Sequence, residues 1–485
     1  MINKRIIFKI LGSLLNIEAA FMTLCLVVSL CYGENDMIPL AITVGVTVAA
    51  ALTLRLLGRG ATNVLSRRDA YLLVTIVWIA FAAFGSLPFL LGGYISNVPD
   101  AFFEAMSGLT TTGATTIDHV EGMPHGVLLW RSLTQWIGGL GIMFFTIAVL
   151  PSFVGGSIKV FAAEATGPVQ SKLQPRLTMS AKALWGIYLV LTIGCALCFF
   201  LFGMGPFDAV NYSMTITATG GFATHDASTG YFNNAAIDYT AIIFMFLSGI
   251  SFAMLYAALF KGRIRHLLKN AEFRFYTAIA LISTAIITAF LLYYNNYSLS
   301  DAIRVSLFQV VSFLTTTGMF NEDAAQWHHI TWVVLSLCMF FGGCAGSTAG
   351  GFKCARGVIA LKIMRNEILH RLHPKAILPV KVNDSTINSS GQITLIAFLM
   401  VYFLLCFIAY FIMILVGVDS TNSFTIALSC ASNVGPTLGL EIGPTMSWSI
   451  LPMGVKWILS ALMLMGRLEI FTVLVIFTPA FWRNN

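Results

Sequence analysis

The sequence is poor in charged residues. Asp, Glu, Lys and Arg make up 10% of the 485 residues, against roughly 25% in an average soluble protein. Hydrophobic residues make up 57%. A chain of this composition cannot cover its whole surface with water-facing side chains, so we predict that lipid surrounds most of it. The shortage of charge excludes an ordinary soluble enzyme or binding domain.

Motifs of catalysis and of nucleotide or metal binding are also lacking. No G-x-G-x-x-G follows a predicted strand, and there is no P-loop. An intramembrane enzyme would need a nucleophile and a base, or a set of metal ligands, at one depth, and Ser, His and Asp do not cluster in that way. The net charge of +7 comes from short basic clusters between apolar segments, so we expect no nucleic-acid partner. We therefore predict no enzymatic activity and no organic cofactor.

Long apolar stretches are abundant. Ten of them have the roughly 20 residues that a membrane span needs, at about 8–31, 37–57, 70–94, 126–150, 183–204, 237–260, 275–295, 330–351, 392–417 and 449–480. Basic residues gather in the connections 151–182, 261–274 and 353–381, and most acidic residues lie in the alternate connections. Positive charge marks the cytoplasmic side, so we predict a multi-pass protein of the inner membrane with both termini cytoplasmic.

A fourfold repeat follows the first two spans. Each repeat has an apolar helix, a shorter segment of about 10–12 residues, a turn rich in Thr, Ser and Gly, and a second apolar helix. The turns lie at 109–115, 216–222, 314–319 and 431–436. A helix of about 12 residues is about 18 Å long, so it can enter the membrane halfway and return but cannot cross it.

The predicted fold is therefore an all-α polytopic membrane protein. It has two leading transmembrane helices and four helix–pore-loop–helix repeats in a pseudo-fourfold arrangement around a pore. The units are 1–66 for the leading helix pair, and 67–158, 159–266, 267–375 and 376–485 for repeats 1 to 4. Extended backbone at mid-membrane is tolerated where it lines an aqueous cavity, and a ring of carbonyl oxygens can replace the hydration shell of K⁺.

These turns resemble those of the Trk/Ktr/HKT superfamily of potassium uptake proteins, specifically the bacterial TrkH type, and the resemblance covers essentially the whole chain. It implies that one glycine in each turn, which we call the key glycine, lines the path of K⁺ together with the two residues before it. The predicted key glycines are Gly113, Gly220, Gly318 and Gly435. The residues that line the path are Thr111, Thr112, Gly113, Ala218, Thr219, Gly220, Thr316, Thr317, Gly318, Asn433, Val434 and Gly435. In plant relatives a serine at a key glycine goes with sodium transport, so glycine in all four turns favours potassium. The third turn departs from the family pattern after its glycine, at 319–323.

A glycine-rich segment interrupts the eighth span. Five glycines lie between 342 and 351, and each costs a helix roughly 0.5–1 kcal/mol relative to alanine. A stripe of small residues for close helix packing is the alternative, but the doubled glycines at both ends favour a break in the helix. The resemblance implies an intramembrane gating loop below the filter, with Gly342, Gly343, Gly346, Ser347, Thr348, Gly350 and Gly351.

Arg467 is a charge within the last predicted span. We place it more than about ten residues from either end of that helix, too deep for ordinary snorkelling, so we predict a functional role. The resemblance implies that Arg467 projects into the permeation path below the filter and modulates cation passage.

The resemblance also implies partners. It predicts a homodimer controlled by a cytosolic TrkA-like nucleotide-binding protein, and the long basic connections 151–182 and 353–390 could contact that regulator or acidic membrane lipid. Solvated flanks of the spans explain the same charges. An ion-coupled secondary transporter, a K⁺/H⁺ or Na⁺ symporter, is the alternative function. It needs buried coupling carboxylates, and in the predicted spans only Glu18 and Glu469 lie deep.

Overall fold

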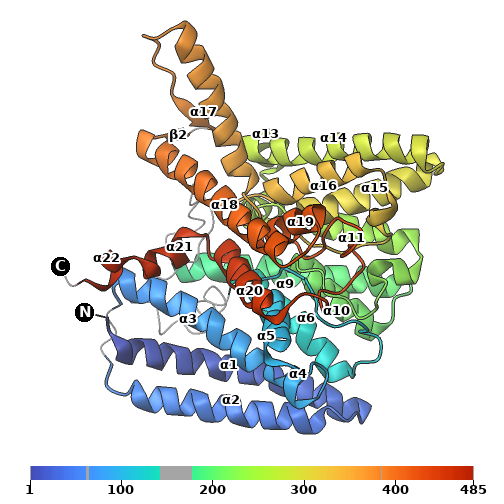
Figure 1. Ribbon diagram of the computed structural model, residues 1–485, viewed down its shortest axis with the longest axis vertical. Helices are drawn as coiled ribbons and strands as arrows, with labels where there is room; N and C mark the ends of the chain where they lie inside the picture. The colour runs from blue at the N-terminus through green and yellow to red at the C-terminus, as the bar shows by residue number, and fades with distance from the viewer. Residues whose placement is uncertain (1, 62–64, 142–176, 384, 484–485) are drawn as a thin grey trace.

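The computed structural model describes residues 2–61, 65–141, 177–383 and 385–483. Within these ranges the regular secondary structure is helical apart from one small antiparallel hairpin of β1 (Val380–Val382) and β2 (Ser385–Ile387) (Figure 1). The predicted all-α fold is confirmed. The connection 151–176 and the end of the predicted span 126–150 lie outside the described residues.

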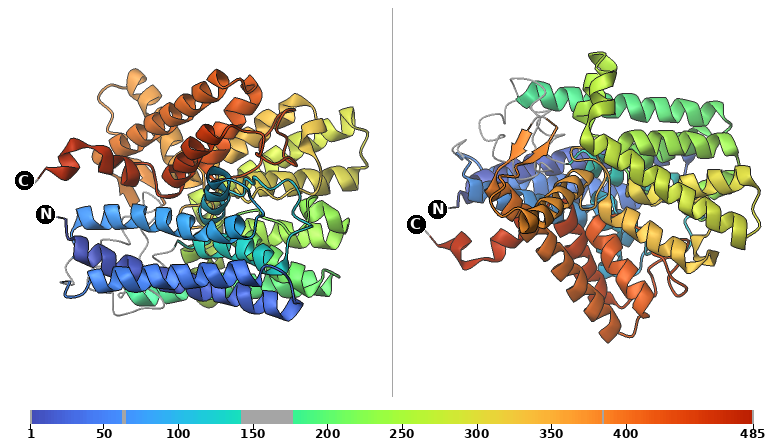
Figure 2. Two further views of the ribbon diagram at one scale, coloured as in Figure 1. Left: turned by 60° about the horizontal axis from the view of Figure 1, so that its bottom comes forward. Right: turned by 90° about the horizontal axis from the view of Figure 1, so that it is seen from above.

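The leading helices α1 (Lys4–Tyr32) and α2 (Met37–Leu57) lie side by side along one edge of the molecule (Figures 1 and 2). The turn between them begins at Gly33, whose φ of 69° suits glycine. Asp36 closes the turn, and its carboxylate accepts the N–H of Val127 at 3.1 Å. The pair is thereby attached to the first repeat.

Four units then follow the predicted plan. Repeat 1 contains α3 (Arg67–Gly85), α4 (Leu87–Leu91), α5 (Val98–Leu109) and α6 (His125–Gly139). Repeat 2 contains α9 (Leu177–Leu201), α10 (Pro206–Thr217), η2 (Ser228–Phe232), α11 (Ala235–Ser248), α12 (Phe252–Phe260) and α13 (Ile264–Lys269). Repeat 3 contains α14 (Ala271–Tyr294), α15 (Leu299–Leu314), η3 (Ala324–Gln326), α16 (His329–Phe341) and α17 (Cys354–Leu372). Repeat 4 contains α18 (Ser389–Leu415), α19 (Ser420–Ser432), α20 (Met453–Arg467), α21 (Phe471–Leu474), η4 (Val475–Phe477) and α22 (Pro479–Trp482).

The helix that precedes the turn in each repeat is too short to cross a membrane. Helices α5, α10, α15 and α19 have 12, 12, 16 and 13 residues, or about 18–24 Å at about 1.5 Å per residue. Each begins at a defined cap. Asn97, Ser298 and Asp419 accept N–H groups of the first turn, and α10 begins with Pro206. The chain must therefore turn back within the membrane after each of them.

Six described helices are long and apolar enough to span a membrane, or up to eight if two bent pairs each count as one. The pair α11 and α12 is bent by 105°, and the pair α20 and α21 by 111°. Neither bend was predicted from the sequence. The break in the predicted span 330–351 is confirmed, because α16 ends at Phe341 and α17 begins at Cys354.

The repeats pack in a closed circle. The helix after each turn packs against the short helix of the next repeat: α6 against α10, α11 against α15, α16 against α19, and α20 against α5. This sequence of contacts returns to its starting point. The four turns are therefore brought to one central position.

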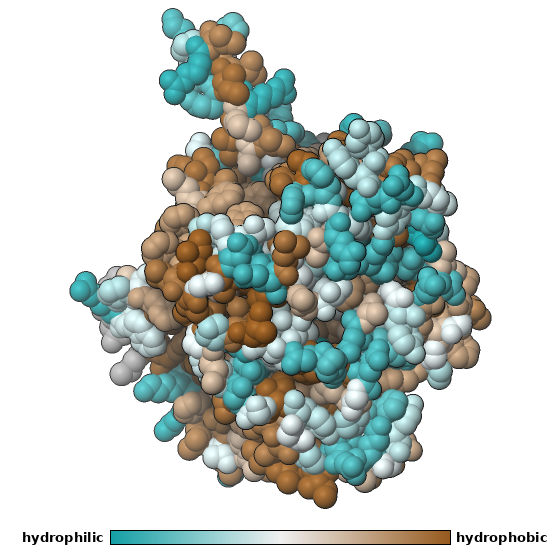
Figure 3. Space-filling model, turned by 45° about the vertical axis from the view of Figure 1, so that its right-hand side comes forward, coloured by the Kyte–Doolittle hydropathy of each residue, from teal (hydrophilic) through white to brown (hydrophobic). Residues whose placement is uncertain are grey.

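The connections 114–124, 222–234, 319–328 and 436–452 gather on the side where α1 turns into α2 and α14 into α15; we call this side the loop face. Figure 3 turns it forward and shows hydrophilic side chains over it, bordered by hydrophobic ones. At the opposite side α17 projects from the body of the molecule (Figure 1).

Candidate functional site

Each short helix ends in a turn with the same unusual backbone. In every turn a non-glycine residue with positive φ precedes, by two positions, a glycine with positive φ. The pairs are Thr111 and Gly113 (54° and 84°), Thr219 and Gly221 (53° and 83°), Thr316 and Gly318 (56° and 74°), and Asn433 and Gly435 (56° and 99°). A non-glycine residue in this conformation is uncommon, and four at equivalent places indicate a functional constraint. We call these segments turns 1 to 4.

Turn 2 has a register that differs by one residue from the one predicted from the sequence, Ala218 to Gly220. Gly221, and not Gly220, has the positive φ of the key glycine. The triplet equivalent to those of the other turns is therefore Thr219, Gly220 and Gly221, while Ala218 is the cap of the preceding helix. The adjacent glycines offered two registers, and only the backbone conformation distinguishes them.

The four turns meet around one axis. A Cβ atom added to a key glycine would lie only 2.0–2.3 Å from a carbonyl oxygen of the neighbouring turn. The contacts join Gly113 to Gly220, Gly221 to Thr317, Gly318 to Val434, and Gly435 to Thr112. They run from each repeat to the next and close a ring. No side chain fits at any of the four glycines without displacing the backbone of its neighbour.

The ring exposes acceptors that have few protein donors. In the described parts of the chain, no N–H or O–H group donates to the carbonyls of Thr112, Thr317 or Val434, whereas that of Gly220 accepts from Gln135 Nε2 at 2.7 Å. Buried carbonyl oxygens are seldom left without a partner. The C-terminal ends of the four short helices add partial negative charge nearby. This arrangement suits a dehydrated cation.

On the loop face, the ring opens into a cavity of about 80 Å³. All four key glycines line it, together with Asp118 and Asp226 from the connections after turns 1 and 2. Acidic side chains thus lie at the mouth of the ring on the loop face, where negative charge raises the local concentration of cations.

A buried ion pair stands behind turns 1 and 2. Arg131 Nε lies 3.0 Å from Glu104 Oε1, and the two side chains are 2% and 0% exposed. Glu104 also accepts the N–H of Thr116 at 2.8 Å, and Arg131 donates to the carbonyl of Ala223 at 3.1 Å. The guanidinium lies over the ring of Phe222, 4.2 Å from its centroid. The pair therefore connects the segments that follow the two key glycines.

Sequence reasoning missed Glu104, Arg131 and Gln135. The signal was present, because Arg131 is a charge inside a predicted span and Glu104 lies in a segment expected to enter the membrane. These three residues and their hydrogen-bond partners come from four different segments of the chain. No fixed sequence spacing therefore predicts that they contact one another.

Below the ring, on the side away from the loop face, residues 342–353 form a non-helical segment between α16 and α17. We call it the glycine loop. It makes hydrogen bonds to turn 3 and to the last residues of α19 and α10: the N–H of Gly350 donates to Thr316 Oγ1 at 2.6 Å, and that of Gly351 to the carbonyl of Ser432 at 2.8 Å. Thr348 Oγ1 donates to the carbonyl of Thr217 at 3.1 Å.

The glycine loop leaves little room beneath the ring. The cavity between Gly350, Gly351, Asn433 and Arg467 has a volume of about 10 Å³, which is about the space that one water molecule needs. Other backbone contacts fix the loop at the α11–α12 bend, where Cys344 donates its N–H to the carbonyl of Gly249 at 2.8 Å. The loop therefore lies directly against turns 3 and 4 and leaves only this small cavity between them.

Arg467 does not lie in the middle of a helix, as the sequence suggested. It is the last residue of α20, at the bend before α21, and it lies beneath the ring. Its guanidinium donates to the carbonyls of Thr348 in the glycine loop at 2.8 Å, and of Gly138 and Gly139 at the end of α6 at 2.7 and 2.5 Å. The bend lets a charge from the final helix reach the loop.

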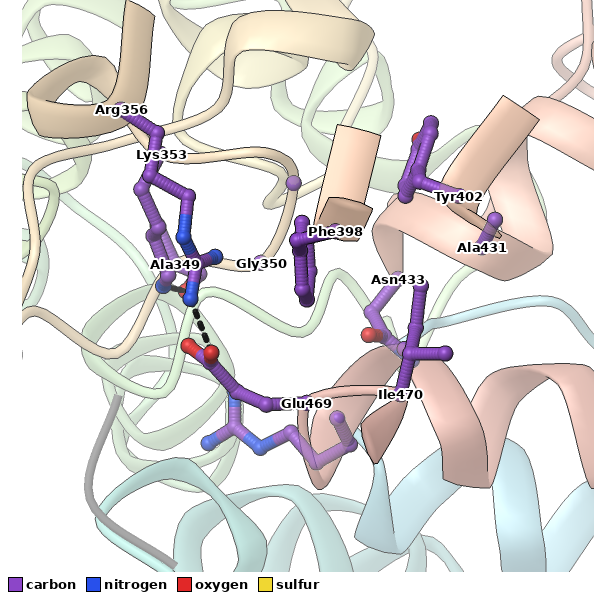
Figure 4. Close-up of a pocket in the computed structure, with 13 residues that line it drawn as sticks. Ala349, Gly350, Lys353, Arg356, Phe398, Tyr402, Ala431, Asn433, Glu469 and Ile470 are labelled. Atoms are coloured by element: carbon purple, nitrogen blue, oxygen red, sulfur yellow. Dashed lines mark hydrogen bonds and ion pairs between the residues drawn. The ribbon is translucent and has the colours of Figure 1, made fainter. Parts of the chain in front are cut away.

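Further charges line the same cavity. Figure 4 shows the carboxylate of Glu469 directed at the guanidinium of Arg356, with which it forms an ion pair. Arg356 lies over the ring of Phe398, 4.1 Å from its centroid. The Lys353 ammonium donates to the carbonyl of Ala349. With Arg467, three basic groups and one carboxylate line this cavity.

Comparisons with known proteins agree with this geometry. The family model TrkH, described as cation transport protein, matches residues 40–484. The Trk system potassium uptake protein TrkH of Halomonas elongata is 38% identical over 99% of each chain, and that of Escherichia coli K12 is 35% identical over the same shares. The crystal structure of the potassium transporter TrkH from Vibrio parahaemolyticus matches with a TM-score of 0.89 at 35% identity, over 99% of each chain.

Proposed function

The chain belongs to the TrkH family of cation transport proteins, and from this premise we propose that it takes up K⁺ across the inner membrane through a channel-like path. The four turns are the selectivity filter. A K⁺ ion exchanges its water shell for carbonyl and hydroxyl oxygens, and because these oxygens carry no full charge the ion is also released.

One observation carries the proposal: the ring in which each key glycine faces a carbonyl oxygen of the next repeat. The spacing leaves no place for a Cβ atom, and three of these four carbonyls have no donor among the described residues. The acidic cavity on the loop face collects cations at one end of the ring. In this proposal the selectivity filter consists of Thr111 to Gly113, Thr219 to Gly221, Thr316 to Gly318 and Asn433 to Gly435.

The glycine loop is the gate in this proposal. It must move away from the contacts of Gly350 and Gly351 for an ion to pass. The bends at 249–251 and 468–470 flank the loop and offer backbone positions where such a movement can be absorbed. Arg467 connects the loop to α6 and places a positive charge on the axis, so it opposes ion passage in the closed state.

We further propose a homodimer regulated by a cytosolic nucleotide-binding partner of the TrkA type, with both termini in the cytoplasm. The projecting α17 supports a cytosolic contact, since it begins directly after the glycine loop and carries exposed basic side chains. A partner that moved α17 would move the gate.

Two glycine substitutions test the proposed filter. Gly435→Ser places a side chain against the carbonyl of Thr112, whereas Gly417→Ser is a matched control, because Gly417 has almost the same φ (95° against 99°) and nothing within 4 Å of an added Cβ atom. Flux of K⁺, Rb⁺ and Na⁺ into vesicles, together with growth of a bacterium deficient in potassium uptake, is the measurement. We expect Gly435→Ser to lose preference for K⁺ and Gly417→Ser to keep it. Equal selectivity in both variants would refute the filter.

Coupled transport is the second candidate, and one observation favours it. Glu18 of α1 is buried, and neither of its carboxylate oxygens has a hydrogen-bond partner among the described residues. A membrane-buried carboxyl group can carry a proton. If Glu18→Gln abolished a dependence of K⁺ uptake on the pH gradient, a K⁺/H⁺ symporter would replace the channel. The channel predicts that uptake follows the K⁺ gradient alone.

A further inference from the structure

A large groove opens on the flank of the molecule between α16, α18 and α19. Its volume is about 850 Å³, within the range of sites that hold small molecules. The walls are apolar and aromatic, with Val333 and Leu337 from α16, Phe403 from α18 and Phe424 from α19. These four side chains are all more than half exposed, so the described chain leaves an apolar surface uncovered.

The two carboxylates that line the groove, and its one histidine, belong to segments at the loop-face end. His329 begins α16, Asp419 caps α19, and Glu441 lies in the connection after turn 4, so these residues line the end nearest the loop face. Asp419 and Glu441 meet there, since the N–H of Asp419 donates to Glu441 Oε2 at 3.2 Å. An occupant needs a long apolar part and a head group that carries positive charge.

The floor of the groove is a single layer of side chains. Tyr402 lines both the groove and the small cavity beneath the four turns, and Figure 4 shows its aromatic side chain at that cavity. Its hydroxyl lies 2.7 Å from that of Ser432, and the carbonyl of Ser432 accepts the N–H of Gly351. Beside it, the ring of Phe340 stacks on that of Phe352 at 5.1 Å. The groove is thus separated from the glycine loop by one residue layer.

We propose that this groove binds one acyl chain of a phospholipid with a primary-amine head group, of the phosphatidylethanolamine class. The acyl chain lies against Leu337, Phe340 and Phe403, and the ammonium group of the lipid lies near Glu441. A bound acyl chain packs against Tyr402 and Phe340 on their groove side. It thereby stabilises the contact of Tyr402 with Ser432 and that of Phe340 with Phe352 of the glycine loop. The binding claim stands independently of transport, whereas the effect on the gate rests on the proposed function.

Binding is tested with the full chain in vesicles that contain a phosphatidylethanolamine with a photoreactive acyl chain. We expect labelling of peptides from α16 and α18. Leu337→Trp fills the groove and reduces labelling there several-fold. Leu281→Trp is the matched control, because Leu281 is a leucine of similar exposure on α14, outside the groove (62% against 54%). Glu441→Gln reduces labelling by this probe but not by the same chain on a phosphatidylglycerol head group, and Glu367→Gln on the exposed α17 changes neither.

Two results would overturn the site. Equal labelling of α16 and α18 in the unchanged protein and in Leu337→Trp would show that the groove does not hold the chain. A photoreactive benzoylphenylalanine at position 337 that yields a covalent dimer in place of a lipid adduct would assign the groove to a second copy of this chain. If labelling behaves as expected and K⁺ flux is the same in Leu337→Trp and Leu281→Trp, the lipid binds but does not act on the gate, and that part of the proposal fails.

Discussion

The side chain of Gln135 makes two hydrogen bonds to turn 2 and the residue that follows it. Its Nε2 donates to the carbonyl of Gly220 at 2.7 Å, and its Oε1 accepts the N–H of Phe222 at 3.0 Å. The amide is fully buried. In the described chain, the equivalent carbonyls of turns 1, 3 and 4 accept no such hydrogen bond. The ring of four turns is therefore asymmetric at turn 2, where Gln135 of α6 contacts it.

Removing this amide should disturb one quarter of the filter. Gln135→Ala leaves the N–H of Phe222 buried without a partner, at a cost of about 1–3 kcal/mol. We expect the preference for K⁺ over Na⁺ to fall by about tenfold, which is the effect of about 1.4 kcal/mol, measured as the ratio of fluxes into vesicles. Gln392→Ala is the control. Gln392 also donates to a carbonyl, that of Ile387 at 3.0 Å, but neither residue belongs to the four turns. A selectivity equal to that of the control would contradict the role of Gln135.

The buried pair of Glu104 and Arg131 should matter far more than an exposed pair. Breaking a buried pair by removing one partner costs about 3–5 kcal/mol, so Glu104→Gln should lower the apparent melting temperature of the purified protein. The exposed pair of Glu367 and Arg371 on α17, 3.5 Å apart, contributes about 0.3–0.5 kcal/mol, so Glu367→Gln should leave that temperature unchanged. Similar melting temperatures for the two variants would show that the pair behind turns 1 and 2 is not a structural support.

Much of this architecture follows from local features of the sequence. The length of the short helices, the Thr and Gly in the turns, and the glycine-rich break after Phe341 each act within about ten residues. Helix length sets what can cross a bilayer, and doubled glycines remove helix preference. These features predicted the repeats and the break, and the structure agrees on both. The proposed boundaries of the four units remain predictions.

Tertiary structure decided the remainder. The sequence does not distinguish Gly220 from Gly221, whereas in the structure turn 2 packs against turn 3 and bonds to Gln135, and Gly221 has the positive φ. The apolar run around Arg467 predicts one helix, yet the chain bends at 468–470, where Glu469 has φ 57° and pairs with Arg356. Contacts between residues that are 113 positions apart leave no periodic signal in the sequence.

If the glycine loop is the gate that we propose, Arg467 should restrain it by its hydrogen bonds as well as by its charge. Arg467→Ala removes the donors to Thr348 and to the end of α6, so we expect K⁺ flux without any regulator to rise. Arg467→Lys keeps the charge but cannot reproduce the planar fork that reaches several carbonyls. It should therefore show intermediate flux. Arg263→Ala, at an exposed position before α13, is the control. A flux that is unchanged in Arg467→Ala would argue against this contact as a part of the gate.

Asp118 should act as a cation-attracting charge at the mouth of the ring. Hydrogen bonds from Ser447 and Ser449 lower the pKa of its carboxyl below the ordinary value of 3.8, against a smaller opposing effect of burial. The Ser449 hydroxyl lies 2.7 Å from Asp118 Oδ1. Because the folded-state pKa is depressed, the contribution of this contact to stability is complete above the unfolded value and is lost only as the pH falls through the lower folded value. Asp118 thus stays charged at neutral and mildly acidic pH.

Asp118→Asn should therefore reduce the initial rate of K⁺ uptake at low external K⁺, and the loss should not vary between pH 5 and 8, a window above the ordinary pKa of an aspartate, about 3.9. Added salt of an impermeant cation should diminish the difference, since exposed charges are screened over about 8–10 Å at physiological ionic strength. Ser449→Ala separates the charge from its support, because it keeps the carboxylate but raises its pKa toward the ordinary value. Uptake in Ser449→Ala should equal that of the unchanged protein at pH 7. A loss of rate in Asp118→Asn that persists undiminished at high salt would mean that Asp118 maintains the shape of the mouth by holding the 447–449 segment, and not its electrostatic potential.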